Sequence, residues 1–125
     1  MTLNNYLTSY LVMKTQYLKN LPEHWQPVAA VYSALGDTTR QKILLLFEPG
    51  EELSIKDIAD QFELGRTTIV HHLNTLEKSG ALSVRRQGRQ ALYKVDHQVI
   101  LEALDNLRQL IDEDLTLLTE KNHAR

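Results

Sequence analysis

The sequence contains no cysteine, so disulfide bonds, thiolate metal sites and thiol-based redox sensing are excluded. It also lacks long apolar runs. The longest, Val28–Tyr32 and Ile43–Phe47, span five residues, whereas a membrane-spanning helix needs about 20. The first residues have neither the basic start nor the unbroken apolar stretch of a secretion signal. From these absences we expect a soluble, cytoplasmic protein that does not contact a membrane.

Enzyme motifs are missing as well. The chain has no Gly-rich phosphate loop, no His-Glu-x-x-His motif and no nucleophile elbow. With 125 residues, of which 42% are hydrophobic, it can form one core but has no room for a separate catalytic domain. We therefore expect a single domain that is not an enzyme and that carries no cofactor.

The charges that are present are unevenly distributed. The net charge of −2 argues by itself against a nucleic-acid partner. Residues 65–95, however, contain six Lys or Arg and one acid, a local balance of +5, whereas the rest of the chain totals −7. Positive charge concentrated on one segment is typical of a surface that contacts phosphates. A charged surface that is merely solvated would show the same pattern, so charge alone does not decide.

The spacing of apolar residues predicts a mainly α-helical fold with one small β-hairpin. A helix over Ile55–Phe62 and a second helix after the turn Glu63–Gly65 are close enough in sequence to form a helix-turn-helix. Ser54 and Asp57 have the spacing of a capping box at the start of the first of these helices. Further helices are expected over residues 3–21, 27–36, 37–47 and 96–118, and strands over 82–84 and 91–95.

The helix that follows Gly65 has two faces. At about 100° per residue, Ile69, Leu73 and Leu76 form an inward stripe. The outward face carries side-chain types that contact base edges: Arg pairs with guanine, Asn with adenine, and Thr or Val contacts a thymine methyl group. A surface helix whose polar face only contacts water is the alternative. The candidate base-contacting residues are Arg66, Thr67, Thr68, Val70, His71 and Asn74.

A basic hairpin comes soon after this helix. Gln87 and Gly88 are predicted at its turn, because glycine tolerates a positive φ. Arg85, Arg86 and Arg89 then cluster at the tip, and three crowded like charges do not help a small domain to fold. A polyanionic partner explains them more simply. Arg86 and Arg89 are the best candidates for phosphate or minor-groove contacts, which makes double-stranded DNA the leading candidate ligand.

Several motifs follow one another in a fixed order: Ala34–Leu44, Ser54–Ala59, Thr67–Leu73, Leu76–Gly80 and the wing Arg86–Arg89. Together they resemble the ArsR/SmtB family of bacterial winged-helix repressors, over about residues 28–110. The resemblance implies a homodimer that binds a palindromic operator and leaves it when an inducer binds. It also places Arg66, Thr67, Val70 and His71 where members of the family contact DNA bases.

Two features depart from the family pattern. Gly65 stands where a capping Ser often begins the recognition helix, at a cost of roughly a few tenths of a kcal/mol. The metal-binding signatures are also absent, because Ser54–Asp57 replaces the cysteine motif and His97 is the only histidine in 96–118. We therefore expect no metal and a non-thiol signal. A metal-responsive repressor that joins His97 to carboxylates across a dimer is an alternative.

The adjacent histidines of the recognition helix do not have the geometry of a metal-binding pair. The side chains of His71 and His72 diverge by about 100° around the helix, so they cannot easily bind one ion. We expect His72 to pack in a half-buried position and His71 to contact DNA.

Both terminal helices carry more apolar surface than one small core absorbs. The C-terminal helix has a wide leucine-rich stripe, and the N-terminal helix adds Tyr6, Tyr10 and Tyr17 beside its leucines. Packing against symmetry mates would bury these faces and set two recognition helices about 34 Å apart, one turn of DNA. We predict a homodimer formed through the terminal helices, and an aromatic-lined pocket between them is where a small-molecule inducer would bind. Simple coverage of the monomer core is the alternative.

Two other functions could use the same basic surface. A winged helix can serve as a protein-interaction module, but protein interfaces seldom need so many cations together. RNA binding is disfavoured because no exposed aromatic residues alternate with the basic ones. The sequence thus predicts a sequence-specific DNA-binding transcriptional regulator. Its single winged-helix domain has an N-terminal helical extension (1–26), a winged helix-turn-helix core (27–95) and a C-terminal dimerisation helix and tail (96–125).

Overall fold

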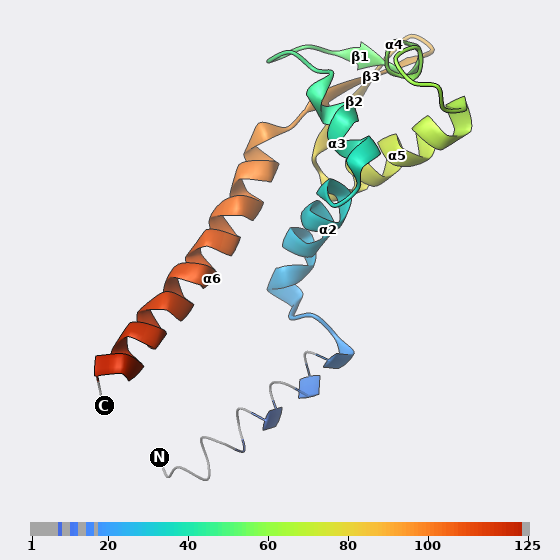
Figure 1. Cartoon of the computed structure of the whole chain (residues 1–125). Coiled ribbons are helices and arrows are strands. Elements are labelled where there is room, and N and C mark those ends of the chain that lie inside the picture. The colour runs from blue at the N-terminus through green and yellow to red at the C-terminus, as the bar shows by residue number, and fades with distance from the viewer. Residues whose placement is uncertain (1–7, 9–10, 13–14, 17, 124–125) are drawn as a thin grey trace.

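The computed structural model describes residues 8, 11–12, 15–16 and 18–123. Most elements gather in a head, and the last helix extends from it as a long stem (Figure 1). In chain order the elements are the 3-10 turn η1 (Glu23–Trp25), α2 (Gln26–Leu35), α3 (Thr38–Leu45), β1 (Leu53–Ser54), α4 (Ile55–Ala59), α5 (Arg66–Ser79), β2 (Leu82–Gln87), β3 (Gln90–Val95) and α6 (His97–His123).

The strands form one small antiparallel sheet in the order β1-β3-β2. Strands β2 and β3 are the predicted hairpin, and the prediction of a mainly helical winged helix-turn-helix is confirmed. Strand β1 was not predicted. It pairs Leu53 with Tyr93 and Ser54 with Leu92. A strand of two residues is too short to show an alternating pattern, and Ser54 is at the same time the cap of α4.

The helix boundaries follow local capping chemistry. The Asp37 carboxylate accepts the Arg40 N–H at 3.0 Å and begins α3. Ser54 and Asp57 form the predicted capping box, in which each side chain accepts the other residue's N–H. Helix α4 ends at Ala59 rather than at the predicted Phe62, because the N–H groups of Gln61 and Phe62 bond to carbonyls three residues back instead of four.

The hydrophobic core lies between α5 and the elements around it. Ile69, Leu73 and Leu76 of α5 are fully buried, as the helical spacing predicted. Ile43 of α3 and Ile58 of α4 are also fully buried in the same cluster. The core therefore fixes the inner face of α5 and leaves its opposite face free.

A second, smaller cluster joins α2 to α6. It consists of Val28 and Val31 from α2 and Ala103 from α6. The Tyr32 hydroxyl donates a hydrogen bond to the Ala103 carbonyl, which ties the two helices together near the head. Beyond this contact α6 continues for about five more turns. It ends at His123, past the predicted end at Leu118.

The described residues between 8 and 19 are helical, in agreement with the helix predicted over 3–21. The Thr15 hydroxyl bonds to the Leu11 carbonyl at 2.9 Å. Leu3, Tyr6, Tyr10 and Tyr17 lie outside the described residues. None of the described helices is both long and apolar enough to cross a membrane.

Candidate nucleic-acid interface

The outer face of α5 presents the side chains that the sequence singled out. Arg66, Thr67 and Thr68 lie in its first turn and are exposed, as are His71 and Asn74, whereas Val70 is half-buried on the flank. Gly65 is the N-cap residue of α5 and has no side chain that could accept a hydrogen bond from the first turn. The first N–H groups of α5 therefore remain able to donate to a ligand. Free N–H groups at a helix start favour an anion.

The start of α5 and the wing enclose a common basic hollow of about 140 Å³. Its cationic side chains come from three elements: Lys56 from α4, Arg66 from α5, and Arg86 and Arg89 from the wing. No acidic side chain lines the hollow. Among the described residues, the side chains of Arg66, Arg86 and Arg89 have no hydrogen-bond or ion-pair partner. The basic hollow is defined by these four cations, and its three arginines offer positive charge that the fold itself does not use.

The wing turn brings Arg89 to the tip. Register pairing continues to Gln87 and Gln90, so the turn consists of Gly88 and Arg89, one residue beyond the predicted position. Gly88 has a φ of +62°, which glycine adopts without strain. Because the strands run longer than predicted, Arg85 and Arg86 lie within β2 and not at the tip.

Arg85 and Arg86 point to opposite faces of the sheet, as adjacent strand residues must. Arg85 forms a two-contact ion pair with Glu52, with Nε–Oε2 at 2.5 Å and Nη2–Oε1 at 3.1 Å. The side-chain hydrogen bond from Arg85 lowers the pKa of Glu52 below its ordinary value, and the same contact raises the pKa of Arg85. The structure thus separates Arg85 from the hollow that contains Arg86 and Arg89.

Arg40 of α3 contacts both α2 and the recognition helix α5. Its Nε donates to the Ala34 carbonyl at 2.7 Å and its Nη2 to the Ser33 carbonyl at 3.0 Å, so it caps the end of α2. Its Nη1 lies 3.3 Å from Nδ1 of His72 on α5. A single guanidinium therefore connects the C-terminus of α2 to the middle of α5.

The two histidines of α5 have different surroundings. The ring centroids of His71 and His72 are 6.1 Å apart and their planes are tilted by 57°. His72 is half-buried, as expected, and its Nδ1 lies 3.9 Å from the Asp37 carboxylate in addition to the Arg40 contact. Within the part of the chain that the structure describes, no group of three or more His, Asp or Glu is placed to hold a metal ion.

Sequence reasoning missed two residues of this region. Lys56 lines the hollow although it belongs to α4, where its Nζ pairs with Asp60 at 2.7 Å. Glu52 neutralises Arg85 from a segment that is distant in sequence. The strand β1 brings both of them beside the wing. No periodic pattern marks so short a strand, so the sequence carried no clear signal for either residue.

Several known proteins are similar to this chain. A family model described as a helix-turn-helix domain matches residues 35–85. The transcriptional repressor SdpR of Bacillus subtilis is 31% identical over 66% of this chain and 91% of its own length. An ArsR-like transcriptional regulator from a Rhodococcus species superposes with a TM-score of 0.71 at 26% identity, over 83% of this chain and 98% of that one.

A homodimeric winged helix-turn-helix DNA-binding domain from Mycobacterium bovis is also similar in structure. It superposes with a TM-score of 0.55 at 27% identity, over 70% of this chain and 80% of that one. The segment that the family model matches contains α3, α4 and α5. The similarity therefore includes the complete recognition helix and the start of β2, the first strand of the wing.

Proposed function

Because the chain belongs to the ArsR/SmtB family of winged-helix transcriptional regulators, we propose that it is a homodimeric repressor that binds a palindromic operator through α5 and the wing. The observation that carries this proposal is the basic hollow. Three of its cations, Arg66, Arg86 and Arg89, have no partner among the described residues. Unneutralised cations that gather at a helix start and a wing fit DNA, with Arg86 and Arg89 at the phosphate backbone and Arg66 at the base edges.

The exposed face of α5 supplies the sequence-reading part of the proposal. Arg66, Thr67, Thr68, His71 and Asn74 are exposed on one helix whose other face is locked in the core. An α-helix of this kind fits the major groove, and each good bidentate pair discriminates against the wrong base by about 1–3 kcal/mol. We propose that α5 reads bases and that Arg86 and Arg89 hold the backbone.

The dimer is supported by an apolar stripe on α6. Its members are exposed between 37% and 55%, although they are leucine or isoleucine: Leu104, Leu107, Ile111, Leu115 and Leu118. Their spacing puts them on one side of the helix. Leu11 and Leu18 of the N-terminal segment are also exposed, at 62% and 88%. A second copy would bury these side chains, as the similarity to a homodimeric DNA-binding domain also suggests.

The test is equilibrium binding to duplex fragments from the protein's own locus, measured by fluorescence anisotropy at several salt concentrations. We expect one fragment to bind preferentially, with affinity falling steeply as salt rises, because phosphate contacts release counterions. Arg108→Ala is a matched control, since Arg108 lies on the stem and pairs with Asp112. It should bind like the wild type.

Binding that does not depend on salt, or the absence of binding to every fragment, would contradict the proposal. Absence of DNA binding together with capture of a protein by the intact α5 and wing surface would favour the protein-interaction module instead. Action in the cytoplasm, where a DNA-binding repressor of this type would meet its operator, is part of the same proposal.

A further inference from the structure

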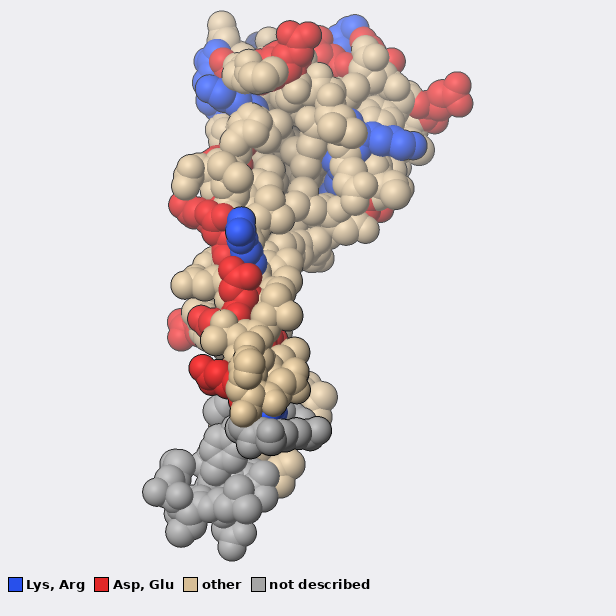
Figure 2. All heavy atoms as spheres, turned by 60° about the vertical axis from the view of Figure 1, so that its left-hand side comes forward, with Lys and Arg blue, Asp and Glu red and all other residues tan. Residues whose placement is uncertain are grey.

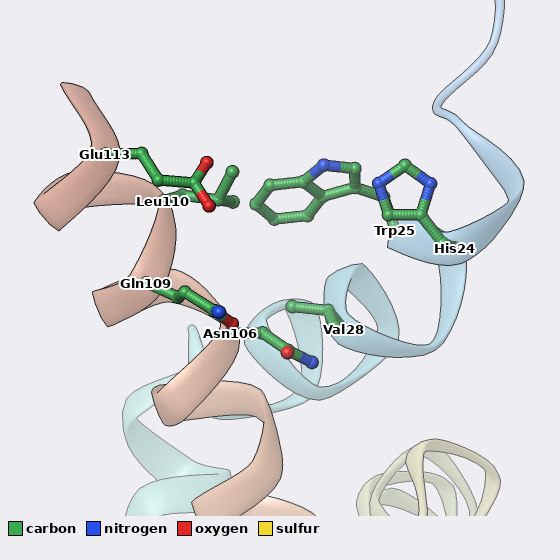
Figure 3. Close-up of a pocket in the computed structure, with 7 residues that line it drawn as sticks. All are labelled: His24, Trp25, Val28, Asn106, Gln109, Leu110 and Glu113. Carbon is green, nitrogen blue, oxygen red and sulfur yellow. The ribbon is translucent and has the colours of Figure 1, made fainter. Parts of the chain in front are cut away.

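A cavity of about 270 Å³ lies between η1 with the start of α2 on one side and the stem helix α6 on the other. Figure 3 shows the Trp25 side chain of η1 pointing across it toward α6. The cavity is lined by His24, Trp25, Val28, Asn106, Gln109, Leu110 and Glu113. Its volume is just below the roughly 300 Å³ at which pockets for drug-sized ligands begin, so it suits a smaller molecule.

The lining combines an aromatic wall with a negative charge. The half-buried Trp25 indole reaches across from η1 toward Leu110 and the Glu113 carboxylate of α6 (Figure 3). Trp is the aromatic side chain that attracts cations best, and a carboxylate adds a charge-assisted hydrogen bond. No Lys or Arg lines the cavity to compete for Glu113. Val28 and Leu110 supply apolar surface for the body of a ligand.

The charge of α6 favours the same class of ligand. Residues 97–123 contain six Asp or Glu against two Lys or Arg. Figure 2 shows acidic side chains along the stem, on the side where α6 comes forward. A surface of one sign raises the local concentration of opposite charges. A cation is therefore drawn to the stem, whereas the polyanionic ligand is drawn to the head.

We propose that this cavity binds a small organic cation, an amine or quaternary ammonium compound with a compact apolar body, and that this ligand is the signal of the repressor. The ammonium group lies between the Trp25 ring and the Glu113 carboxylate. Asn106 and Gln109 provide the remaining polar contacts at the cavity wall. The proposed binding site depends only on the cavity, whereas the effect of the ligand on DNA binding rests on the proposed repressor function.

Helix α2 connects the cavity to the recognition helix. Its first residues line the cavity through Val28, and the end of the same ten-residue helix is held by Arg40. Arg40 in turn contacts His72 on α5. Helix α2 also packs directly on α5. A ligand that moves the start of α2 away from α6 therefore changes the position of α5, because a short helix moves as a rigid element.

The stem places the cavity opposite the surface proposed for dimerisation. Asn106, Gln109, Leu110 and Glu113 follow the i, i+3, i+4, i+7 spacing of one helix face. The centre of the exposed apolar stripe that includes Leu104 lies about 150° around α6 from the centre of this face. The same helix thus contacts the ligand on one side and the partner subunit on the other, so dimerisation does not close the cavity.

The test is isothermal titration calorimetry of the full-length protein with choline and with benzyltrimethylammonium, and dimethylbutanol serves as the uncharged isostere of choline. Trp25 is the only tryptophan in the chain, so its fluorescence reports the same site independently. We expect both cations to bind and to quench Trp25, and dimethylbutanol to bind at least about tenfold more weakly, since it lacks the charge-assisted contact.

Two matched variants locate the site. Glu113→Gln keeps the shape of an exposed side chain and removes its charge, and should weaken cation binding about tenfold. Glu120→Gln makes the same change further along α6, outside the cavity, and should bind cations like the wild type. Thermal melts of all three proteins show whether they are equally folded. Equal affinity of Glu113→Gln and wild type, equal affinity for dimethylbutanol and choline, or no binding of either cation would overturn the proposed site.

The regulatory part is tested by repeating the DNA titration at saturating cation. We expect the affinity for the operator fragment to fall at least about tenfold for the wild type, within the usual range of allosteric coupling. In Glu113→Gln the same cation concentration should have little effect. Unchanged DNA affinity at full cation occupancy would overturn the signalling role. A protein that binds cations but no DNA fragment would overturn the proposed repressor function and leave the cation site in place.

Discussion

The Arg85 guanidinium is bound by the Glu52 carboxylate through two contacts, Nε–Oε2 at 2.5 Å and Nη2–Oε1 at 3.1 Å. This pair links β2 to the residue that precedes β1. Arg86, the next residue in the strand, faces the basic hollow together with Arg89. The three wing arginines, which look equivalent in the sequence, therefore divide into one that is neutralised within the fold and two that are available to a ligand.

This division predicts different losses for neighbouring substitutions. Arg86→Ala should weaken binding to all duplexes alike and reduce the slope of log affinity against log salt by about one, because one phosphate contact is removed. Arg85→Ala should change the slope little, since Glu52 already neutralises Arg85. Anisotropy titrations at four or more salt concentrations measure both slopes. Equal slopes for the two variants would show that the ion pair opens when DNA binds.

The recognition helix should control sequence preference and not general affinity. Arg66→Ala and His71→Ala remove candidate base contacts and should reduce the preference for operator over scrambled duplex by about 1–3 kcal/mol each. Arg86→Ala is the comparison, since its loss should leave that preference unchanged. The measurement is a pair of anisotropy titrations, one on each duplex. If the helix and wing variants lost the same preference, the division between base reading and backbone contact would be wrong.

Gly80 ends α5 with a φ of +85°, a left-handed conformation that costs a residue with a Cβ about 1–2 kcal/mol. A Cβ at this position would also lie 3.2 Å from Cγ1 of Val99. Gly50 has a similar φ of +78° but no atom within 4 Å of the added Cβ. Urea unfolding should therefore show a larger loss of stability for Gly80→Ala than for Gly50→Ala. Equal losses would mean that Val99 shifts without cost.

The capping box predicts sensitivity to acid. The backbone N–H of Ser54 bonds to the Asp57 carboxylate at 3.0 Å and lowers the pKa of that carboxyl below its ordinary value. A lowered folded-state pKa contributes stability above the unfolded pKa of about 3.9, and this contribution is lost as the pH falls through the folded-state pKa. The melting temperature of the wild type should thus fall more steeply below about pH 4 than that of Asp57→Asn.

A control for the acid prediction is Asp114→Asn, which changes an exposed carboxylate on the stem. This variant should keep the steep acid dependence of the wild type. An Asp57→Asn variant whose melting temperature follows the wild-type curve throughout would show that the capping box makes no ionic contribution.

Much of the head could be predicted because its residues obey local rules. The inward stripe of Ile69, Leu73 and Leu76 follows from helical spacing alone, and all three are fully buried. The Ser54–Asp57 capping box follows from a three-residue spacing. Each of these features depends on residues that are close together in the sequence. The fold class and the exposed face of α5 were therefore predictable from the sequence.

The ion pair between Arg85 and Glu52 could not be predicted in the same way. The two residues are 33 positions apart, and they meet only because β1 pairs with β3. The link from Arg40 to His72 spans 32 positions and depends equally on tertiary packing. The pocket expected between the terminal helices involves tyrosines outside the described residues, and no sequence signal indicated the cavity between η1, α2 and α6 that Trp25 lines. Long-range pairing decides such contacts, and one sequence contains no direct signal for it.

A hydroxyl-radical footprint of the protein on the preferred fragment from its own locus tests directly whether a homodimer binds an inverted repeat. A homodimer that inserts two copies of α5 into the major groove should protect two symmetric patches whose centres lie about 10 base pairs apart, or a multiple of one helical turn. The patches should coincide with the halves of an inverted repeat. A single protected patch, or uniform protection without preferred positions, would show that two copies of α5 do not bind the two halves of one operator.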